Sequence, residues 1–457
     1  MRKKLKVCLV GSSGGHLTHL YMLKPFWQDK NRFWVTFDKE DARSLLECEK
    51  MYSCYYPTGS KYMLDYWLIM ITPVIDTING LYILKYGATG FSIGTIYRLL
   101  LLIYVISRIS NKKTLLIQFL PLLYFPIIGL SRGENNLFGC FTYATKWILP
   151  ITLILYYGLA KNDKNEIEKC LKKTIGFWCK FVPLSLIIEY LLDLGELSYY
   201  DAGFKGLYYS TNDIALVLIV CFIYVLWETI NIDIHNVVWC IAGFVAIMIL
   251  STKSSIIFAL ISLVYILIIS KKIKIRHIVS ISVILFVVWK IANIGTQFSD
   301  IMTRYLTMWQ GTLGNKWLDR LLIFATSGRT SRIPTYFSEI YKHGILIINF
   351  LFGWITPDNA HVIEMDWHDL LCQYGISGFL ICLCEYGYLL MKCKSKAQPY
   401  FYIVIVCLIY SILAGHVISG AFSGTAFALV FSLLLLESRK SYNVGGNGEN
   451  CNTQKRV

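Results

Sequence analysis

The chain has 457 residues, a formal net charge of +15, 55% hydrophobic residues and only 16% charged residues. A soluble domain averages about 25% charged residues and lacks apolar runs of roughly 20 residues, the length that crosses a bilayer. Such runs recur from about position 63 to position 437, which excludes a soluble globular protein and predicts a polytopic membrane protein. Most Lys and Arg lie in short segments between these runs, so the charge predicts topology and not a nucleic-acid partner.

The first 60 residues differ from the rest because they are polar and charged. KVCLV is a short apolar strand, too short for a signal peptide, and a Gly/Ser turn with a helix start follows it. RFWVTF (32–37) is a second strand, and KEDARSLLECEKMY is a short helix. This order predicts the β-α-β-α opening of a parallel nucleotide-type fold. The Gly11–Gly15 turn is a candidate phosphate contact at a helix N-terminus, against the alternative of a purely structural turn.

From Met63 the sequence contains about 12 candidate spans by the length rule. Their expected cores are 64–84, 93–107, 114–130, 138–160, 174–192, 212–228, 237–251, 254–270, 278–295, 373–391, 399–415 and 420–436. With a cytoplasmic N-terminus, the strongly basic short loops all fall on the inner face, as the positive-inside rule requires. We therefore expect both termini in the cytoplasm, a multi-pass domain over 61–439, and a disordered cytoplasmic tail over 440–457.

The 14 cysteines are scattered, and most lie within the apolar runs. No CxxC pair or metal-like Cys/His spacing occurs, and buried cysteine behaves as a small hydrophobe. The sequence therefore predicts neither a disulfide framework nor a metal site, and no cofactor.

In this topology a long segment over 296–372 lies outside the membrane. Its apolar stretch at 345–355 is too short to cross a bilayer, so we expect it to be interfacial or re-entrant. Basic residues here run against the positive-inside bias. They include Arg304, Arg320, Arg329 and Arg332. A guanidinium group binds two phosphate oxygens at once and stays charged, so the pattern predicts a diphosphate-binding site. The competing explanation is ion pairing inside the loop.

A group of ionisable residues follows in DNAHVIEMDWHDLL (358–371), at the mouth of a span. His361, Glu364 and Asp366 belong to it. Such groups at a membrane helix end are costly unless they are solvated or useful. The functional interpretation is a carboxylate that acts as general base on a sugar hydroxyl, beside arginines that hold the leaving diphosphate.

Further polar residues lie near the outer ends of other spans. Lys205 and Asn212 lie in GFKGLYYSTND, Lys253 in STKSS, and Arg98 within a span. We predict that Lys205, Asn212 and Lys253 contribute to substrate binding together with Arg304, Arg320 and His361. The competing explanation is that long cationic side chains reach out to the membrane surface.

From Met63 to about Arg439 the chain resembles the Wzy-type repeat-unit polymerases, which are related to the O-antigen ligase-like membrane proteins. The resemblance rests on motifs in order along the chain. They are ITPVIDTING with IGTIYRLLLLIY, GLYYSTNDIALVL, STKSSIIFALISLVYIL, SGRTSRIPTYF, FLFGW and EMDWHDLLCQYGISGFL.

This resemblance implies an all-α, GT-C-like membrane glycosyltransferase that needs neither a metal nor a nucleotide sugar. It would polymerise undecaprenyl-diphosphate-linked oligosaccharide repeat units into capsular polysaccharide or exopolysaccharide on the outer face of the cell membrane. The resemblance implies catalytic roles for Arg329, Arg332, Glu364 and Asp366. Ligase relatives often have His-Asn where this chain has Glu364-Met365, which favours a polymerase. Membrane lipids and a chain-length regulator are the further partners that we expect.

The first 58 or so residues resemble the start of PssD-like capsule glycosyltransferase accessory subunits. VCLVGSSGGHLTHL, FWVTFDKEDARSLL and YSCYYPT carry that resemblance, which stops after Pro57-Thr58. The remaining elements of that fold do not follow, so we expect residues 1–60 to be a truncated, catalytically idle Rossmann-like fragment. About 60 residues rarely bury enough surface to be stable alone.

Two other functions compete with the polymerase. A flippase of lipid-linked repeat units also has about a dozen spans, but such transporters favour two similar halves. Alternatively, the N-terminal part is the functional unit and the spans anchor a cytosolic glycosyltransferase.

Overall fold

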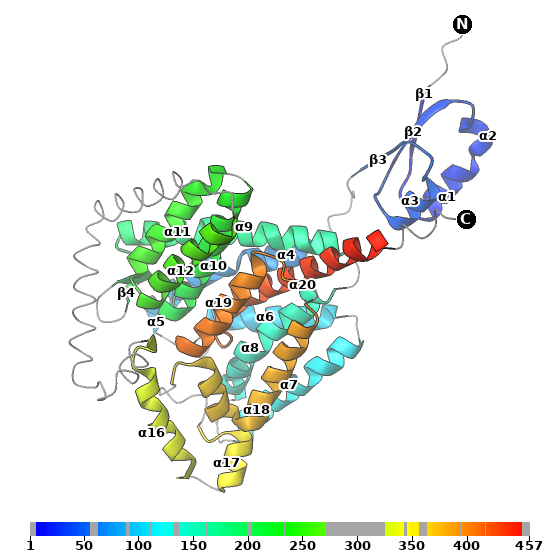
Figure 1. Cartoon of the computed structure of the whole chain (residues 1–457). Coiled ribbons are helices and arrows are strands. Elements are labelled where there is room, and N and C mark those ends of the chain that lie inside the picture. The colour runs from blue at the N-terminus through cyan, green and yellow to red at the C-terminus, as the bar shows by residue number, and fades with distance from the viewer. Residues whose placement is uncertain are drawn as a thin grey trace. The chain divides into compact units, whose positions relative to one another are not determined.

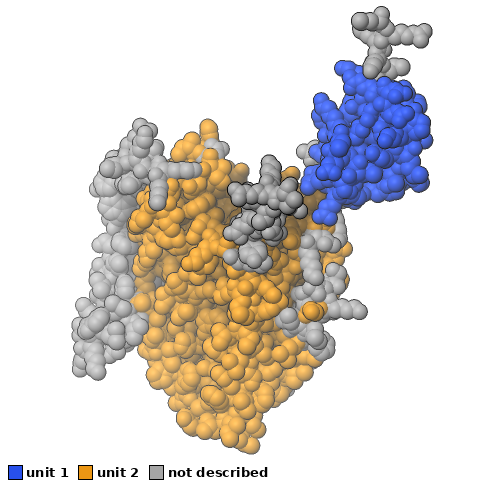
Figure 2. Space-filling view, turned by 45° about the vertical axis from the view of Figure 1, so that its right-hand side comes forward, with its two compact units in different colours: residues 1–64 blue, residues 65–457 orange. Residues whose placement is uncertain are grey.

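The computed structural model describes residues 6–54, 63–87, 92–109, 112–131, 137–160, 163–198, 203–232, 234–270, 325–341, 345–355, 363–393, 395–415 and 417–449. The chain divides into two compact units, Met1–Leu64 and Asp65–Val457 (Figure 2). This division falls four residues after the predicted end of the N-terminal fragment at residue 60.

Unit 1 is a small parallel sheet with short helices between its strands (Figure 1). Its strands and helices, in chain order, are β1 (Lys6–Val10), α1 (Gly15–Met22), α2 (Lys24–Trp27), β2 (Asn31–Thr36), α3 (Glu40–Leu45) and β3 (Met51–Ser53). β2 is central, with Lys6 of β1 opposite Asn31 and Met51 of β3 opposite Trp34. The predicted β-α-β-α order is present, and β3 adds a strand that the sequence interpretation did not include.

The core of unit 1 lies between the sheet and its helices. It consists of Leu9, Leu17, Trp27, Trp34, Ala42 and Leu46. Trp34 also donates from Nε1 to Glu49 Oε2 at 3.1 Å, and Arg32 pairs with the same carboxylate. Val10 and Tyr52 remain 66% and 49% exposed. Parallel sheets are usually covered on both faces, so this sheet has less cover than a complete fold of its type.

Unit 2 is helical, apart from the two-stranded antiparallel pairing of β4 (Glu196–Leu197) with β5 (Phe204–Gly206) among the residues described. Its first α-helices are α4 (Met63–Met70), α5 (Thr72–Tyr86), α6 (Ile93–Arg108), α7 (Lys112–Ser131), α8 (Leu137–Leu153) and α9 (Lys164–Leu191). A π-helical turn (Ile154–Gly158) follows α8, and a 3-10 turn (Ile234–Asn236) precedes α11. The later α-helices are α10 (Thr211–Asn231), α11 (Val237–Leu250), α12 (Lys253–Ser270), α16 (Ile333–Ser338), α17 (Leu346–Phe352), α18 (Asp366–Met391), α19 (Tyr400–Leu413) and α20 (Ala421–Glu449). Short 3-10 turns at Arg329–Arg332 and Glu339–Tyr341 flank α16.

Among the residues described, five helices are long and apolar enough to cross a membrane. They are α9, α10, α12, α18 and the Ala421–Arg439 part of α20. A sixth span results if α4 and α5, which are bent by 42°, form one broken span. The chain is thus a mainly helical protein with several membrane-spanning candidates. The predicted cores within the described residues lie mainly on helix, although the core 64–84 is broken between α4 and α5, and 278–295 lies outside the described residues.

Helices α10 and α20 form the centre of unit 2. In the most apolar 18-residue stretch of each helix, 78% of the residues of α10 and 89% of those of α20 are buried. The corresponding share for α12 is 33%. α10 packs against α9, α11, α12 and α20, and α20 packs against α8 and α19. Polar groups at the first turns of these two helices are therefore held inside the bundle.

The described part of segment 296–372 packs on a broken helix. α18 is interrupted at Gly375, whose φ of 67° and ψ of −172° are not helical, and α17 packs against α18 with Leu351 beside this break (Figure 1). The amide of Trp354 donates to the Cys372 carbonyl at 2.8 Å, and Ser377 Oγ donates to the Leu351 carbonyl at 2.7 Å. A separate apolar cluster holds the segment together. It contains Ile340, Trp354, Ile355, Ile363, Met365 and Cys372.

Candidate functional site

The site centres on Arg329, which begins the 3-10 turn after Gly328. Its Nε and Nη2 donate to Glu364 Oε2 at 3.2 and 3.0 Å, and its Nη1 donates to the Thr326 carbonyl at 3.3 Å. The side chain of Arg329 is 8% exposed and that of Glu364 is 27% exposed. A nearly buried guanidinium is costly unless it is paired, so the carboxylate fixes Arg329 in place. Two predicted catalytic residues, 35 positions apart in the sequence, are thus in direct contact.

Two more cations lie close to this pair. Arg332 Nη1 lies 3.9 Å from Glu364 Oε1, and the Arg332 side chain is 51% exposed. Lys253, the first residue of α12, is buried and close enough to Arg329 for their positive charges to repel each other. Two arginines therefore lie beside one carboxylate, and the buried Lys253 lies near the first of them. Such an excess of positive charge in a poorly solvated place favours an anion, and arginines bind phosphate oxygens well.

The backbone of Glu364 is held in an unusual conformation. Its φ is +64°, which is rare for a residue other than glycine. The Asp369 carboxylate accepts from the amides on either side, Ile363 at 2.8 Å and Met365 at 3.2 Å. Gly415 packs so closely that a Cβ there would lie 2.0 Å from the Glu364 carbonyl oxygen. Backbone strain that persists because its surroundings enforce it is concentrated at functional sites.

Asp366 lies two residues after Glu364, but its surroundings are different. Its side chain is fully buried and accepts hydrogen bonds from the Val417 and Ile418 amides at 2.8 and 2.9 Å and from Ser419 Oγ at 2.6 Å. These bonds join the start of α18 to the connection between α19 and α20. The geometry favours a positioning role for Asp366 and makes Glu364 the better candidate for direct contact with a substrate.

The other predicted binding residues lie elsewhere. Lys205 forms an ion pair with Glu196 at 2.7 Å across the β4–β5 pairing and donates to the Tyr209 carbonyl. Asn212 is buried in the first turn of α10. Among the described residues, no hydrogen bond or ion pair joins either residue to Arg329 or Glu364. Arg304, Arg320 and His361 lie outside the described residues.

The structure gives roles to residues that were not predicted as site residues, although Asp369 belongs to the ionisable group at 358–371. Asp369 and Gly415 contact the backbone at Glu364 and hold it in its unusual conformation. Asp76, Lys146 and Asp213 lie inside the helical bundle near Arg98. Asp76 and Lys146 each interrupt an apolar run, in VIDTING and ATKWILP. Intramembrane charges are rare and usually functional, so this interruption is the signal that could have identified them.

In unit 1 the predicted phosphate-contacting turn already has an acidic partner. The Gly14 amide donates to Asp41 Oδ2 at 2.6 Å. A phosphate at this amide would meet a carboxylate of the same charge sign. The Gly14 amide is therefore already engaged within unit 1 itself.

No group of three or more His, Cys, Asp or Glu residues suited to a metal ion occurs within the part of the chain that the structure describes. Comparison with known proteins gives no match to a family model, to a curated protein or to a solved structure.

Proposed function

We propose that unit 2 is a glycosyltransferase that polymerises undecaprenyl-diphosphate-linked repeat units into capsular polysaccharide or exopolysaccharide on the outer face of the cell membrane. The observation that carries this proposal is the hydrogen-bonded Arg329–Glu364 pair with Arg332 and Lys253 beside it. This group combines an anion-binding charge with a carboxylate that remains partly exposed. Both are required where a glycosyl diphosphate reacts with a sugar hydroxyl.

The topology in this proposal has twelve spans in a GT-C-like arrangement, with both termini cytoplasmic. Under it, the starts of α12 and α18 lie at the outer face, because each follows an outer connection. Lys253 and Glu364 come from those two places, which lie far apart in the sequence. Their convergence beside Arg329 supports a single outer site.

The reaction breaks the bond between the anomeric carbon of the growing glycan and its diphosphate. A hydroxyl of the incoming lipid-linked repeat unit forms the new bond to that carbon, and undecaprenyl diphosphate leaves with the electron pair. Glu364 accepts the hydroxyl proton, while Arg329, Arg332 and Lys253 stabilise the charge that develops on the leaving diphosphate. The donor is already activated, so the proposed reaction needs no nucleotide and no cofactor.

The test is complementation of a strain from which the gene has been deleted, with the surface glycan resolved by size. Arg329→Ala should abolish polymer longer than one repeat unit, and Arg329→Lys should restore it only partly, because lysine cannot donate the paired hydrogen bonds. Arg43→Ala, at an exposed arginine of unit 1 paired with Asp38, is the matched control and should leave the size ladder unchanged. A full ladder from Arg329→Ala at normal protein abundance would remove Arg329 from the site.

The same strain separates the competing functions. Loss of a polymerase leaves single repeat units on the outer surface of the cell, whereas loss of a flippase keeps them inside. A chain-length regulator as partner would become visible as a change in the modal length of the polymer when the regulator is deleted.

A further inference from the structure

A second charged group lies inside the bundle, apart from the Arg329 site. We call Asp76 of α5, Arg98 of α6, Lys146 of α8 and Asp213 of α10 the charged cluster. Arg98 Nη2 donates a short hydrogen bond to Asp76 Oδ1. Lys146 is attracted to Asp213 and repelled by Arg98, and the Asp76 and Asp213 carboxylates repel each other. Two cations and two carboxylates from four helices therefore influence one another, and their formal charges cancel.

Several polar atoms of the charged cluster and of Asn212, the residue before Asp213 in α10, are unpartnered. Arg98 Nε, Asp76 Oδ2 and Asn212 Nδ2 are buried and form no hydrogen bond among the described residues. Asp76 and Asn212 are only 8% and 4% exposed. A buried donor or acceptor without a partner costs about 1–3 kcal/mol, so a fold rarely retains several together without a use.

The charged cluster is connected to the outer segment. Asp213 Oδ1 accepts from Ser423 Oγ at 2.7 Å, and Ser423 lies in the first turns of α20. Ser423 Oγ also lies 3.4 Å from the carbonyl of Val417, whose amide is bound by Asp366. Each member of the cluster lies within ten residues of the helix end that the proposed topology places outside. The cluster therefore belongs to the same side of the bundle as Glu364.

We propose that the charged cluster, together with Asn212, binds hydroxyl groups of the sugar part of the lipid-linked repeat unit. The unpartnered atoms include both donors and an acceptor, and a sugar hydroxyl both donates and accepts. A diphosphate would be less suitable, because Asp76 and Asp213 balance the two cations. In this proposal the Arg329 site binds the diphosphate, and the charged cluster binds the sugar. This inference rests on the proposed function.

Asn212→Leu is the most informative substitution. Leucine has a similar volume, and no described hydrogen bond is lost from Nδ2. If the cluster serves only to hold the helices together, removing an unpartnered buried donor should be neutral or stabilising. If Asn212 binds a sugar, the variant remains folded and loses affinity for the glycan. The control is Asn231→Leu, which makes the same change at the other end of α10, where Nδ2 donates to the Trp227 carbonyl at 3.2 Å.

The experiment measures binding of two lipids to the full chain in lipid nanodiscs by native mass spectrometry. One is undecaprenyl diphosphate without sugar, and the other is the lipid-linked repeat unit extracted from the deletion strain. Asn212→Leu should weaken binding of the sugar-bearing lipid about tenfold, the effect of roughly one hydrogen bond, and leave the bare lipid unchanged. Asn231→Leu should bind both lipids as the unaltered protein does.

The outcomes separate this inference from the proposed function. Unchanged binding of both lipids by Asn212→Leu, or an equal loss for both, would overturn the sugar site. Arg329→Ala should weaken binding of both lipids, because both carry the diphosphate. If Arg329→Ala left binding of undecaprenyl diphosphate intact, the proposed anion site would fail, whatever Asn212 does.

Discussion

Glu364 and Asp366 are acidic residues two positions apart, and their surroundings give them different tasks. Glu364 pairs with Arg329 and Arg332 and keeps about a quarter of its side chain exposed, whereas Asp366 is enclosed by three donors from residues 417–419. A side chain whose oxygens are all engaged cannot also receive a substrate proton without losing those bonds. The sequence alone presents the two carboxylates as equivalent.

Asp366→Asn should loosen the connection between α19 and α20. An amide is uncharged, so the bonds from the Val417 and Ile418 amides to the single acceptor oxygen would be weaker, and the NH2 group would face Ser419 Oγ, which now donates to Oδ1. The expected loss is about 2 kcal/mol of local stability, or roughly 30-fold faster hydrogen exchange at the Val417 and Ile418 amides. Hydrogen–deuterium exchange with mass spectrometry measures this directly.

Asp38→Asn, which alters the exposed pair with Arg43 in unit 1, is the control for that experiment. It should not change exchange at Val417 or Ile418. Equal protection at these amides in Asp366→Asn and in the unaltered protein would contradict the positioning role.

Glu49 should make the stability of unit 1 depend on pH. The hydrogen bond from Arg32, with help from Trp34, holds the pKa of Glu49 below its usual range. A depressed pKa stabilises the fold above the unfolded value of about 4.3 and ceases to do so as pH falls through the folded value. The protection factors of the β2 amides, which correct for the intrinsic pH dependence of exchange, should therefore fall below about pH 4.3.

Glu49→Gln should destabilise unit 1 by about 1 kcal/mol at pH 7, because the pair is partly open to solvent. The difference from the unaltered protein should vanish at low pH, when both side chains are neutral. A difference that persisted unchanged at pH 3 would show that charge is not its cause.

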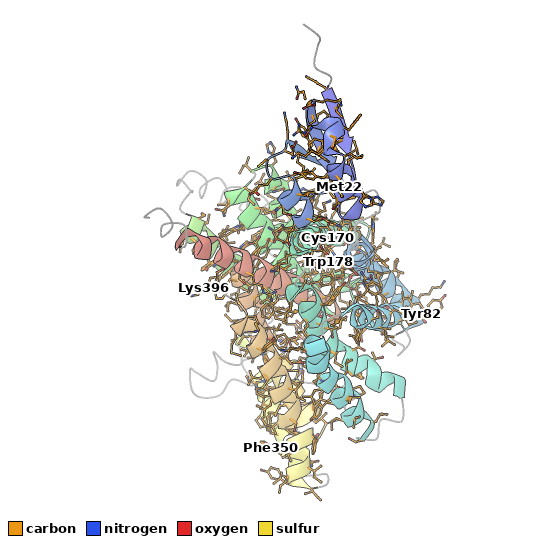
Figure 3. All side chains as sticks on the ribbon, turned by 90° about the vertical axis from the view of Figure 1, so that its right-hand side faces the viewer. Met22, Tyr82, Cys170, Trp178, Phe350 and Lys396 are labelled. Atoms are coloured by element: carbon orange, nitrogen blue, oxygen red, sulfur yellow. The ribbon has the colours of Figure 1, made fainter. Side chains whose placement is uncertain are left out.

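At the scale of elements, α17 has the reverse of a soluble pattern. Its polar Asn349 is 5% exposed and donates to the Ile340 carbonyl, while Ile347 is 68% and Phe350 49% exposed. Phe350 lies at one extremity of unit 2 (Figure 3). This short helix buries the side-chain amide of Asn349 and exposes its apolar side chains. Such a pattern is expected of an interfacial or re-entrant segment, because lipid chains can cover exposed apolar side chains.

Gly375 permits the close contact between α17 and α18. Its φ is +67°, and a Cβ there would lie 2.4 Å from the Leu351 backbone. Gly375→Ala should therefore displace α17 and cost more than about 1 kcal/mol, since both strain and collision oppose it. Limited proteolysis within 346–352, followed in nanodiscs, should become faster.

Gly387 provides the control, because it lies in the same helix and a Cβ there would meet nothing within 4 Å. Gly387→Ala should leave proteolysis unchanged. Equal proteolysis rates for the two alanine variants would show that the break at Gly375 does not hold α17 in place.

At the scale of the whole molecule, unit 1 and unit 2 have separate cores. If unit 1 is an idle fragment, deletion of residues 2–60 should leave the surface glycan ladder unchanged. The measurement is the size distribution of the glycan, normalised to the amount of unit 2 in the membrane. Loss of polymer with unit 2 folded and abundant would assign a function to unit 1.

The sequence predicts the helical membrane character well, because hydropathy acts through long runs that need no tertiary information. It also predicts that the outer arginines and acids belong to one region, and the structure brings Arg329 to Glu364. It could not separate Asp366 from Glu364, because the donors around Asp366 come from residues about 50 positions later. It also missed the partnership of Asp76 with Arg98, since contacts between helices leave no periodic signal in the chain.

The hydrogen bonds of Asp366 couple the start of α18 to the residues that lead into α20. A ligand that displaces Glu364 would also displace the start of α18, two residues later. The hydrogen bonds from the Val417 and Ile418 amides to Asp366 would transmit this displacement to the beginning of α20. Among the candidate spans of the described residues, α20 has the largest buried share. A small displacement of Glu364 would therefore alter the packing in the interior of the bundle. Occupancy at the surface and the packing of the interior are therefore linked through a single carboxylate.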